Sequence, residues 1–397
     1  MSAPVLYVAR FVPSYRQPVL ERLNTRLHGR LVVCAGQPPA TSSFTALTSD
    51  PATSYRQVSL RNYWLGGERV HAQPFGSALE LNPAVVLAEE SPRSLTLPLL
   101  LRDAKRRGAG TLLWGHFSSN NRTLSRWHPL DRYRIALARN ADGCVCYTDQ
   151  IAAMLRQHVP HQRLFVARNT LDTDILFALY DALLKEGRSA VRNRLGIDET
   201  IPTLAFIGRL VTAKGAHQLL DTYKALHSRG RVALLIIGAG PEENAMRARC
   251  KRENWSEVRF LGPLTALEVS APYLFAADVL VSPGYMGLSI CHAFALGLPV
   301  VTQTSPKAHV RYHSPEITYI QEGENGLLSP YGDAEGLVQA VRVILANQKH
   351  FSEKAISYAR EHLQIEGMVD GLEQAIRFAE RISTANPRVG VPPSGDG

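Results

Sequence analysis

Short aliphatic and β-branched runs alternate with amphipathic stretches along nearly the whole chain, and this alternation restricts the folds open to it. In the first half, buried strands are predicted at Val5–Ala9, Leu31–Cys34, Val85–Ala88, Thr111–Trp114, Gly143–Tyr147 and Leu164–Ala167. Amphipathic helices are predicted between them at Val19–Leu27, Leu95–Lys105, Leu130–Ala138 and Gln150–His158. Strands that are apolar throughout and alternate with helices are typical of a parallel sheet covered on both faces.

The same rhythm restarts in the second half. Strands are predicted there at Thr203–Ile207, Val232–Ile237, Val258–Leu261, Val279–Ser282, Pro299–Thr302 and Ile317–Ile320. We therefore predict an α/β protein of two doubly wound, Rossmann-like domains that face each other across a cleft. We expect the first domain over residues 1–175 and the second over 176–365. A C-terminal helix over 366–382 is expected to return to the first domain, followed by a disordered tail over 383–397.

The composition excludes several classes of protein. With 45% hydrophobic and 20% charged residues, the chain is neither disordered nor a coiled coil. Its five cysteines form no C-x-x-C pair and predict reduced thiols rather than a disulfide scaffold or a zinc site. No apolar run approaches the about 18–20 residues of a spanning helix, and the first residues lack the pattern of a signal peptide. We expect a cytoplasmic protein.

Positive charge is concentrated in the first half. Residues 1–170 carry 21 Lys and Arg against 10 Asp and Glu, whereas the remainder carries 23 against 25. The cations include Arg102, Lys105, Arg106 and Arg107, and then Arg122, Arg126, Arg132, Arg134 and Arg139. A solvated basic face is one interpretation; the other is a surface held peripherally against the anionic cytoplasmic face of the inner membrane. The basic–aromatic interleaving of nucleic-acid-binding modules is absent from the sequence, which argues against a nucleic-acid partner.

The strongest candidate site follows a strand of the second half. That strand ends at Gly208, Arg209 comes next, and Lys214 lies near the start of the following helix. Ligands of open α/β sheets bind outside the carboxyl ends of the strands. Two cations beside a helix N-terminus at this edge favour a diphosphate, the alternative being a solvated basic turn.

A later strand ends in a second turn of this kind. The turn carries Gly284 and Gly287 and opens a helix at Leu288 and Ser289. Glycines allow a ligand to approach the backbone closely, and free amides at the start of a helix favour an anion. No D-x-D motif stands at a strand end, so we expect neither a metal nor any cofactor beside the substrate.

In the first half, candidate polar residues also follow strands. His116 comes directly after one strand and faces the expected cleft, unless it only caps the next turn. Glu89 and Glu90 end another strand; since adjacent strand residues point to opposite faces, at most one of them reaches a site. A solvated pair of carboxylates is equally compatible with the pattern.

Several motifs in order resemble the donor domain of GT-B glycosyltransferases of family 4. They are G-R-L-x-x-x-K-G, I-I-G-A-G-P, F-L-G, A-A-D-V-L-V-S-P and A-F-A-L-G-L-P-V-V, which span essentially all of residues 200–330. The first half is similar to the acceptor domain of that family more loosely, at Y-R-Q-P-V around Arg16, at W-G-H around His116 and at A-R-N-T-L-D around Asn169. The resemblance implies that Asn169 helps to join the domains.

The sequence departs from the family at its E-x7-E pattern, whose two positions hold Gly284 and His292. The resemblance implies that His292 contacts the ribose of the donor; a histidine that only packs in the core is the alternative. Glu316, in a P-E-I motif that the family shares, is expected to bond either to backbone or to ligand. The resemblance also places the nucleobase at the Gly262–Thr265 turn.

The resemblance implies a retaining glycosyltransferase that is independent of metal. It would move a sugar from a UDP- or GDP-linked donor to a glycan or lipid-linked acceptor in the synthesis of a cell-surface polysaccharide or lipopolysaccharide. Arg209 and Lys214 would neutralise the diphosphate, and His116 would lie at the donor sugar. Two alternatives stay open: a nucleotide-sugar 2-epimerase of the same fold, and a non-catalytic nucleotide-binding partner subunit.

Overall fold

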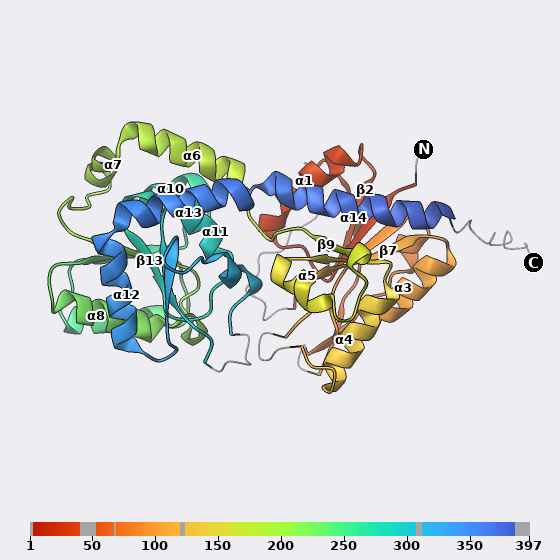
Figure 1. Ribbon diagram of the computed structural model, residues 1–397, viewed down its shortest axis with the longest axis horizontal. Helices are drawn as coiled ribbons and strands as arrows, with labels where there is room; N and C mark the ends of the chain where they lie inside the picture. The colour runs from red at the N-terminus through yellow and green to blue at the C-terminus, as the bar shows by residue number, and fades with distance from the viewer. Residues whose placement is uncertain (1–2, 40–52, 67–68, 120–123, 307–311, 386–397) are drawn as a thin grey trace, which may run out of the picture. The chain divides into compact units, whose positions relative to one another are not determined.

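The structure, a computed structural model, describes residues 3–39, 53–66, 69–119, 124–306 and 312–385. Its backbone contacts divide the chain into two compact units. The first contains the described residues of Met1–Ser119, those of Leu124–Arg168, and the C-terminal segment from Glu366 onward; the second contains those of Asn169–Ile365. Figure 1 shows each sheet surrounded by its own helices.

The first unit is built on a parallel sheet in the order β3-β2-β1-β6-β7-β8-β9. Its strands are β1 (Val5–Ala9), β2 (Leu31–Ala35), β3 (Arg56–Ser59), β6 (Val85–Glu89), β7 (Gly110–Gly115), β8 (Gly143–Cys146) and β9 (Leu164–Val166). Its helices are α1 (Gln17–Arg26), α2 (Gly76–Leu79), α3 (Leu97–Arg106), α4 (Pro129–Asn140), α5 (Asp149–Leu155) and α14 (Ile365–Ala385). A short antiparallel hairpin, β4 (Tyr63–Leu65) and β5 (Val70–Ala72), lies outside this sheet.

Helix α14 is part of the first unit although it ends the chain. A Cβ at Gly371 would lie only 2.1 Å from the carbonyl oxygen of Val166, so the missing side chain lets the helix lie against the end of β9. An ion pair of 2.7 Å between Arg30 and Glu380 joins the helix to the turn before β2. The helix continues through Ala385, past the expected end at residue 382; residues 386–397 of the expected tail lie outside the described part.

The second unit has a six-stranded parallel sheet in the order β12-β11-β10-β13-β14-β15. Its strands are β10 (Thr203–Ile207), β11 (Ala233–Ile237), β12 (Val258–Gly262), β13 (Val279–Ser282), β14 (Val300–Gln303) and β15 (Gly326–Ser329). Its helices are α6 (Thr173–Glu186), α7 (Arg188–Arg194), α8 (Ala216–His227), α9 (Glu243–Arg252), α10 (Leu267–Ala276), α11 (Ser289–Ala295), α12 (Ala334–Ala346) and α13 (Gln348–His362). The predicted α/β class with two parallel sheets is confirmed.

The last predicted strand, Ile317–Ile320, is wrong. Pro315–Tyr319 form a 3-10 helix, and the sixth strand is β15, which pairs with β14. The apolar composition of this run suggested a strand, but its residues are buried by packing against other parts of the unit and not by pairing with a strand. For example, the Tyr319 hydroxyl donates to the carbonyl of Asn169 at 3.0 Å. This bond also lies within the second unit, which begins at Asn169 rather than at the expected residue 176.

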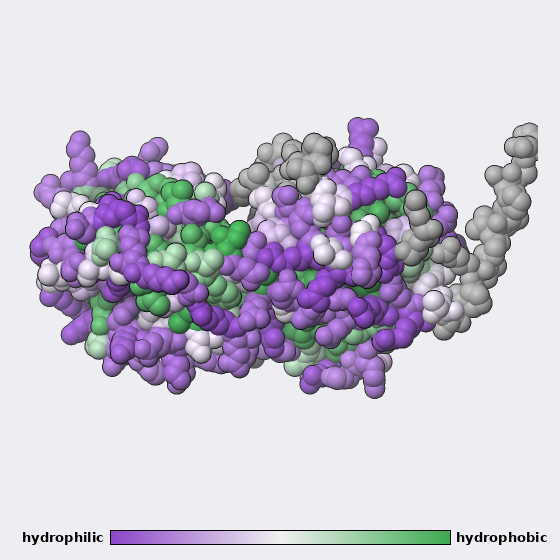
Figure 2. All heavy atoms as spheres, turned by 90° about the horizontal axis from the view of Figure 1, so that it is seen from above, coloured by the Kyte–Doolittle hydropathy of each residue, from purple (hydrophilic) through white to green (hydrophobic). Residues whose placement is uncertain are grey.

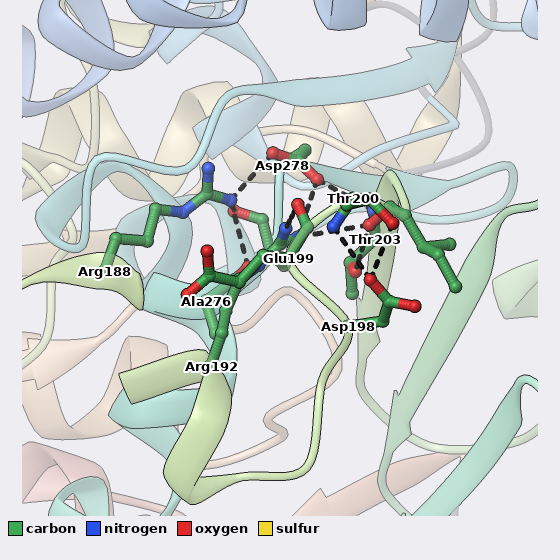
Figure 3. Close-up of polar contacts among 10 residues, drawn as sticks. Arg188, Arg192, Asp198, Glu199, Thr200, Thr203, Ala276 and Asp278 are labelled. Atoms are coloured by element: carbon green, nitrogen blue, oxygen red, sulfur yellow. Dashed lines mark hydrogen bonds and ion pairs between the residues drawn. The ribbon is translucent and has the colours of Figure 1, made fainter. Parts of the chain in front are cut away.

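Strands β10 and β13 are held together at their amino ends by a buried ionic network (Figure 3). Asp278 accepts from the amide of Thr203 at 2.7 Å and forms ion pairs with Arg188 and Arg192 at 2.7 and 3.0 Å. Arg192 also donates to the carbonyl of Ala276 at 2.9 Å. The network joins α7 to the amino ends of the two central strands.

The surface is mixed in polarity. Hydrophilic side chains predominate on the face shown in Figure 2, with apolar ones between them. Among the residues that the structure describes, no helix is long and apolar enough to cross a membrane. All five cysteines are buried and free.

Candidate functional site

The carboxyl end of β10 lies at the centre of the second sheet, between β11 and β13. This is the point at which the strand order reverses, where doubly wound sheets bind their ligands. Gly208 follows β10, and its φ of +149° favours glycine. A Cβ at Gly208 would lie 3.8 Å from Cε of Lys214, so the loop from Gly208 to Lys214 folds back on itself. Arg209 is exposed within this loop.

The loops after β10 and β13 lie against each other through backbone. A Cβ at Gly284 would lie 2.4 Å from the amide nitrogen of Gly215 and 2.3 Å from the carbonyl carbon of Lys214. The amide of Tyr285 donates to the carbonyl of Ala213 at 2.8 Å. Only a residue without a side chain fits at position 284, so the glycine at the first position of the E-x7-E pattern brings the two loops together.

Lys214 is half-buried at this junction. Its Nζ lies 4.9 Å from the centroid of the Tyr285 ring. Burial lowers the pKa of Lys214 to about 8, and the Glu316 carboxylate partly opposes that shift. Because the ammonium group of Lys214 has already lost much of its hydration, the free-energy cost of removing the remaining water when it binds a phosphate is smaller. The face of the Tyr285 ring stabilises the positive charge before a ligand binds.

A third loop, before the 3-10 helix at Pro315–Tyr319, supports Tyr285 and Met286. The hydroxyls of Tyr285 and Ser314 form a hydrogen bond. His313 accepts from the amide of Met286 at Nδ1, at 3.0 Å, and its Nε2 lies 2.8 Å from the carbonyl of Gln303. Burial lowers the pKa of His313 to about 4, so the ring is neutral and Nε2–H donates. Sequence reasoning missed these residues because no motif links them to the earlier turn.

Helix α11 places two polar side chains beside this junction. Ser289, its first residue, and His292, one turn later, are both half-buried. The Ser289 hydroxyl and Nδ1 of His292 are buried atoms without a hydrogen-bond partner among the described residues. Burial lowers the pKa of His292 to about 4, which leaves the ring neutral. Two unsatisfied polar atoms separated by one helical turn favour a ligand with hydroxyl groups over simple core packing.

Glu316 and Asn169 are paired within the second unit. Both are buried, and the Asn169 side-chain amide donates to the Glu316 carboxylate. The expectation that Glu316 also bonds to backbone or to a ligand stays a prediction. The pair brings Asn169, the first residue of the unit, to the carboxylate that acts on Lys214. Asn169 Oδ1 has no hydrogen-bond partner in the described part of the chain.

In the first unit, Arg16 and His116 share an aromatic environment after β1 and β7. The Arg16 guanidinium is buried and lies 4.6 Å from the centroid of the Trp114 ring and 5.6 Å from that of Tyr147. The His116 ring meets Tyr147 edge-on at 4.7 Å between centroids. The structure therefore places these two predicted residues around one tyrosine.

Glu89 and Glu90 both pair with arginines of the first unit. Burial opposes ionisation of Glu89, but its ion pair and hydrogen bonds with Arg10 outweigh burial and lower its pKa. Glu90 forms a 2.8 Å ion pair with Arg134, which also contacts Asp131 at 3.1 Å. Arg134 is buried in this cluster and therefore does not belong to the predicted cationic surface.

The predicted residues thus form two groups, each within one unit. The second unit brings Gly208, Arg209, Lys214 and Gly284 to one edge of its sheet, with Gly287, Leu288, Ser289 and His292 in the adjoining turn and helix. The first brings Arg16 and His116 together and leaves Glu89 with Arg10. No cluster of His, Cys, Asp or Glu with the makings of a metal site occurs within the described ranges.

Comparison with known proteins finds a family match within the second unit. Residues 201–347 match the family model described as Glycosyl transferases group 1. The lipopolysaccharide core biosynthesis glycosyltransferase LpsE of Rhizobium meliloti is 29% identical over 218 residues, which cover 54% of this chain and 57% of LpsE. A GDP-mannose-dependent monoacylated phosphatidylinositol monomannoside mannosyltransferase of Corynebacterium glutamicum is 32% identical over 131 residues, covering 30% and 34% of the two chains.

Solved structures extend the likeness to both units. The structure of HepE from Anabaena in complex with UDP has a TM-score of 0.67 to this chain at 16% sequence identity, covering 94% of this chain and 99% of HepE. At that identity the likeness shows the fold alone. The chain spans about half the length of LpsE and about a third of the mannosyltransferase.

Proposed function

We propose that this chain, which its matching residues and its fold identify as a group 1 glycosyltransferase of the GT-B type, transfers a hexose from a nucleotide sugar to a glycan or lipid-linked acceptor. The observation that carries the proposal is the junction of the Gly208–Lys214 loop with Gly284, which presents a half-buried cation at the reversal point of the sheet. Relatives that act in lipopolysaccharide core synthesis and on a mannosylated phosphatidylinositol support a cell-surface glycan or lipid as the acceptor.

The donor diphosphate would bind between Arg209 and Lys214. Both cations belong to one loop, and charge-assisted hydrogen bonds from them would offset the charge that builds up on the leaving diphosphate. The amides of Leu288 and Ser289 would face the same anion. The Gly262–Thr265 turn would hold the base, and the resemblances favour neither uracil nor guanine: HepE is bound to UDP, and the mannosyltransferase uses GDP-mannose.

His292 would contact the ribose. Its Nδ1 and the Ser289 hydroxyl are the buried polar atoms that lack a partner at this helix, and an imidazole nitrogen can accept from a ribose hydroxyl. A neutral histidine would thus take the place of one missing glutamate, whereas the position of the other holds Gly284, which lies against the backbone of Lys214 and Gly215.

The transfer would proceed with retention and without a metal. The bond between the anomeric carbon and the diphosphate oxygen breaks, and the acceptor oxygen forms its bond to the same face of that carbon. The acceptor proton passes to the leaving diphosphate, whose charge Arg209 and Lys214 hold. His116 would bind the sugar or the departing phosphate. Glu89 would position Arg10 rather than take a proton, because its pKa is lowered.

We also propose that the first unit attaches to an anionic membrane surface. Arg102, Arg106, Arg126, Arg132 and Arg139 are exposed, although Asp103 pairs with Arg102 at 2.9 Å and lies 3.9 Å from Arg106. Each unpaired cation near an anionic bilayer contributes about 1 kcal/mol. Sedimentation with vesicles containing phosphatidylglycerol tests this: binding should appear at low salt and disappear near 0.5 M salt, where the screening length is only about 4 Å. Absence of binding at low salt would refute attachment.

Nucleotide binding is the first test of the proposed activity. The melting temperature should rise with UDP or GDP, or with a sugar linked to one of them, and the rise should be lost in Lys214→Ala. No rise with any nucleotide would favour the non-catalytic subunit and overturn the proposal. NMR of the donor without acceptor then separates the classes: slow release of sugar with retained anomeric configuration supports a transferase, whereas formation of an epimer identifies an isomerase.

A further inference from the structure

A groove on the first unit is lined by apolar side chains and two arginines. It lies between the start of β5, the segment that follows β6 and the first turns of α4, and has a volume of about 660 Å³. Its lining consists of Arg69, Val70, Pro92, Arg93, Ser94, Leu95, Leu130 and Tyr133. None of these residues belongs to the site described above.

Backbone hydrogen bonds fix one wall of the groove. The amide of His71, on β5, donates to the carbonyl of Arg93 at 3.0 Å, and the amide of Leu95 donates to the carbonyl of His71 at 2.9 Å. The Gln73 amide donates to the Thr96 hydroxyl at 3.1 Å. These bonds tie the hairpin to the segment after β6, so the groove is formed before any ligand arrives and binding need not order it.

The two arginines of the groove have no counter-charge among the residues that the structure describes. Arg69 and Arg93 are exposed, and neither guanidinium forms a hydrogen bond or ion pair with a residue that the structure describes. By contrast, Arg10 and Arg134 of the same unit pair with Glu89 and Glu90. A phosphate group would find several N–H donors on these two side chains.

Two large apolar side chains of the lining are exposed. Leu95 is 55% and Leu130 is 46% exposed, and both belong to this one groove. Val70 and Tyr133 are half-buried beside them. Apolar side chains gathered in a hollow and bordered by cations fit a ligand that has an apolar chain and an anionic head.

We propose that this groove binds a phosphate-bearing lipid. Its apolar chain lies along Val70, Leu95, Leu130 and Tyr133, and its phosphate meets Arg69 and Arg93. If the proposed glycosyl transfer holds, on which this assignment of role rests, the groove carries the lipid part of a lipid-linked acceptor. The charge of the arginines and the apolar lining together exclude a free sugar or a zwitterionic lipid as the preferred occupant.

Calorimetric titration of the full chain with dihexanoylphosphatidic acid, a lipid short enough to stay monomeric, tests the site. We expect saturable binding that weakens about tenfold or more in the Arg69→Ala/Arg93→Ala double variant. Leu130→Glu should also weaken it, because it places a carboxylate in the apolar lining. The matched control is Arg56→Ala/Arg156→Ala, which removes two exposed arginines of the first unit outside the groove and should bind as the unchanged chain does.

Two comparison ligands decide which chemistry is recognised. Dihexanoylphosphatidylcholine and inorganic phosphate should both bind more weakly than the phosphatidic acid. If inorganic phosphate binds as tightly as the phosphatidic acid, the groove is a simple anion site and the proposal is overturned. If the phosphatidylcholine binds as tightly, the arginines have no role, and the proposal is overturned as well. Binding of the phosphatidic acid that is unchanged in the variants also overturns it. UDP and GDP are titrated into the same protein preparations. Binding of a nucleotide without binding of the lipid refutes the proposed lipid site alone. Binding of the lipid without binding of either nucleotide refutes the proposed glycosyl transfer alone.

Discussion

The Nζ atom of Lys214, in the loop after β10, lies 4.9 Å from the centroid of the ring of Tyr285, which belongs to the loop after β13. The contact depends on Gly284, whose backbone lies against Lys214 and Gly215. The Tyr285 ring therefore packs against a half-buried ammonium group at the edge of the sheet, where the charge of that group is available to an anion.

The affinity for nucleotide should depend on pH through Lys214. Its pKa of about 8 means that the free protein carries the ammonium below that pH and loses it above. The diphosphate binds the charged form, so affinity should be nearly constant below about pH 7, drop to roughly half at about pH 8, and then fall by up to about tenfold for each further pH unit. The Lys214→Arg variant stays charged throughout and should show a flat profile. The measurement is a calorimetric titration with the preferred nucleotide; parallel profiles for the two proteins would exclude Lys214 from the phosphate site.

Turnover should fall when either cation of the loop is removed. We expect Arg209→Ala and Lys214→Ala each to lose at least about tenfold in kcat, since a charge-assisted contact to the leaving diphosphate contributes roughly 2–4 kcal/mol to the transition state. Lys349→Ala, which removes an exposed lysine of α13, is the control and should be fully active. Initial rates of donor consumption measure the effect. Normal turnover in both loop variants would mean that the donor binds elsewhere.

Replacement of His292 should separate a ligand contact from core packing. His292→Ala should weaken nucleotide binding by about 1–2 kcal/mol, the value of one hydrogen bond whose partner is left unsatisfied. His292→Gln keeps a side-chain acceptor and should lose less. Affinities from titration are compared with melting temperatures of the same proteins. If both variants bind equally well but melt earlier, the histidine serves the core.

Removal of Asp278 should destabilise the second unit. Its carboxylate holds Arg188, Arg192 and the amide of Thr203, and Asp278→Ala would leave the buried Arg192 without its ion pair. Breaking a buried pair in this way costs about 3–5 kcal/mol of unfolding free energy. Asp221→Ala, which breaks an ion pair with Arg249 at the surface, should cost less than about 1 kcal/mol. Urea unfolding compares them, and equal losses would show that the network adds no more than a surface pair.

Most strands of both sheets, all except β3 and β15, and the residues that follow them could be predicted because they depend on local pattern. Runs such as Thr203–Ile207 are apolar along their length and are bounded by glycine, which marks a buried parallel strand before its partners are known. Since parallel strands end at one edge, Gly208, Arg209, Lys214 and Gly284 were predicted to lie near one another without any knowledge of distances.

Local pattern failed where burial comes from distant side chains. Ile317–Ile320 has the composition of a strand, yet the run forms a 3-10 helix whose Tyr319 bonds to Asn169, while the shorter β15 completes the sheet. Arg134, on α4, has the spacing of a surface cation, yet it is buried in an ion pair with Glu90, which directly follows β6. Neither partner is encoded near the residue it contacts.

The sequence by itself therefore determined the α/β class, the two sets of strands and the edge of the second sheet at which the cations lie. Only the tertiary structure decided the contacts of the charged groups: the Tyr285 ring beside Lys214, the Asn169 amide on Glu316, and no partner among the described residues for the guanidinium groups of Arg69 and Arg93. The physical reason is that strand and helix patterns arise from the periodic burial of neighbouring residues, whereas charge pairing and hydration depend on loops brought together across the sheet. The pKa of Lys214 and the groove beside Leu130 follow from that second kind of contact.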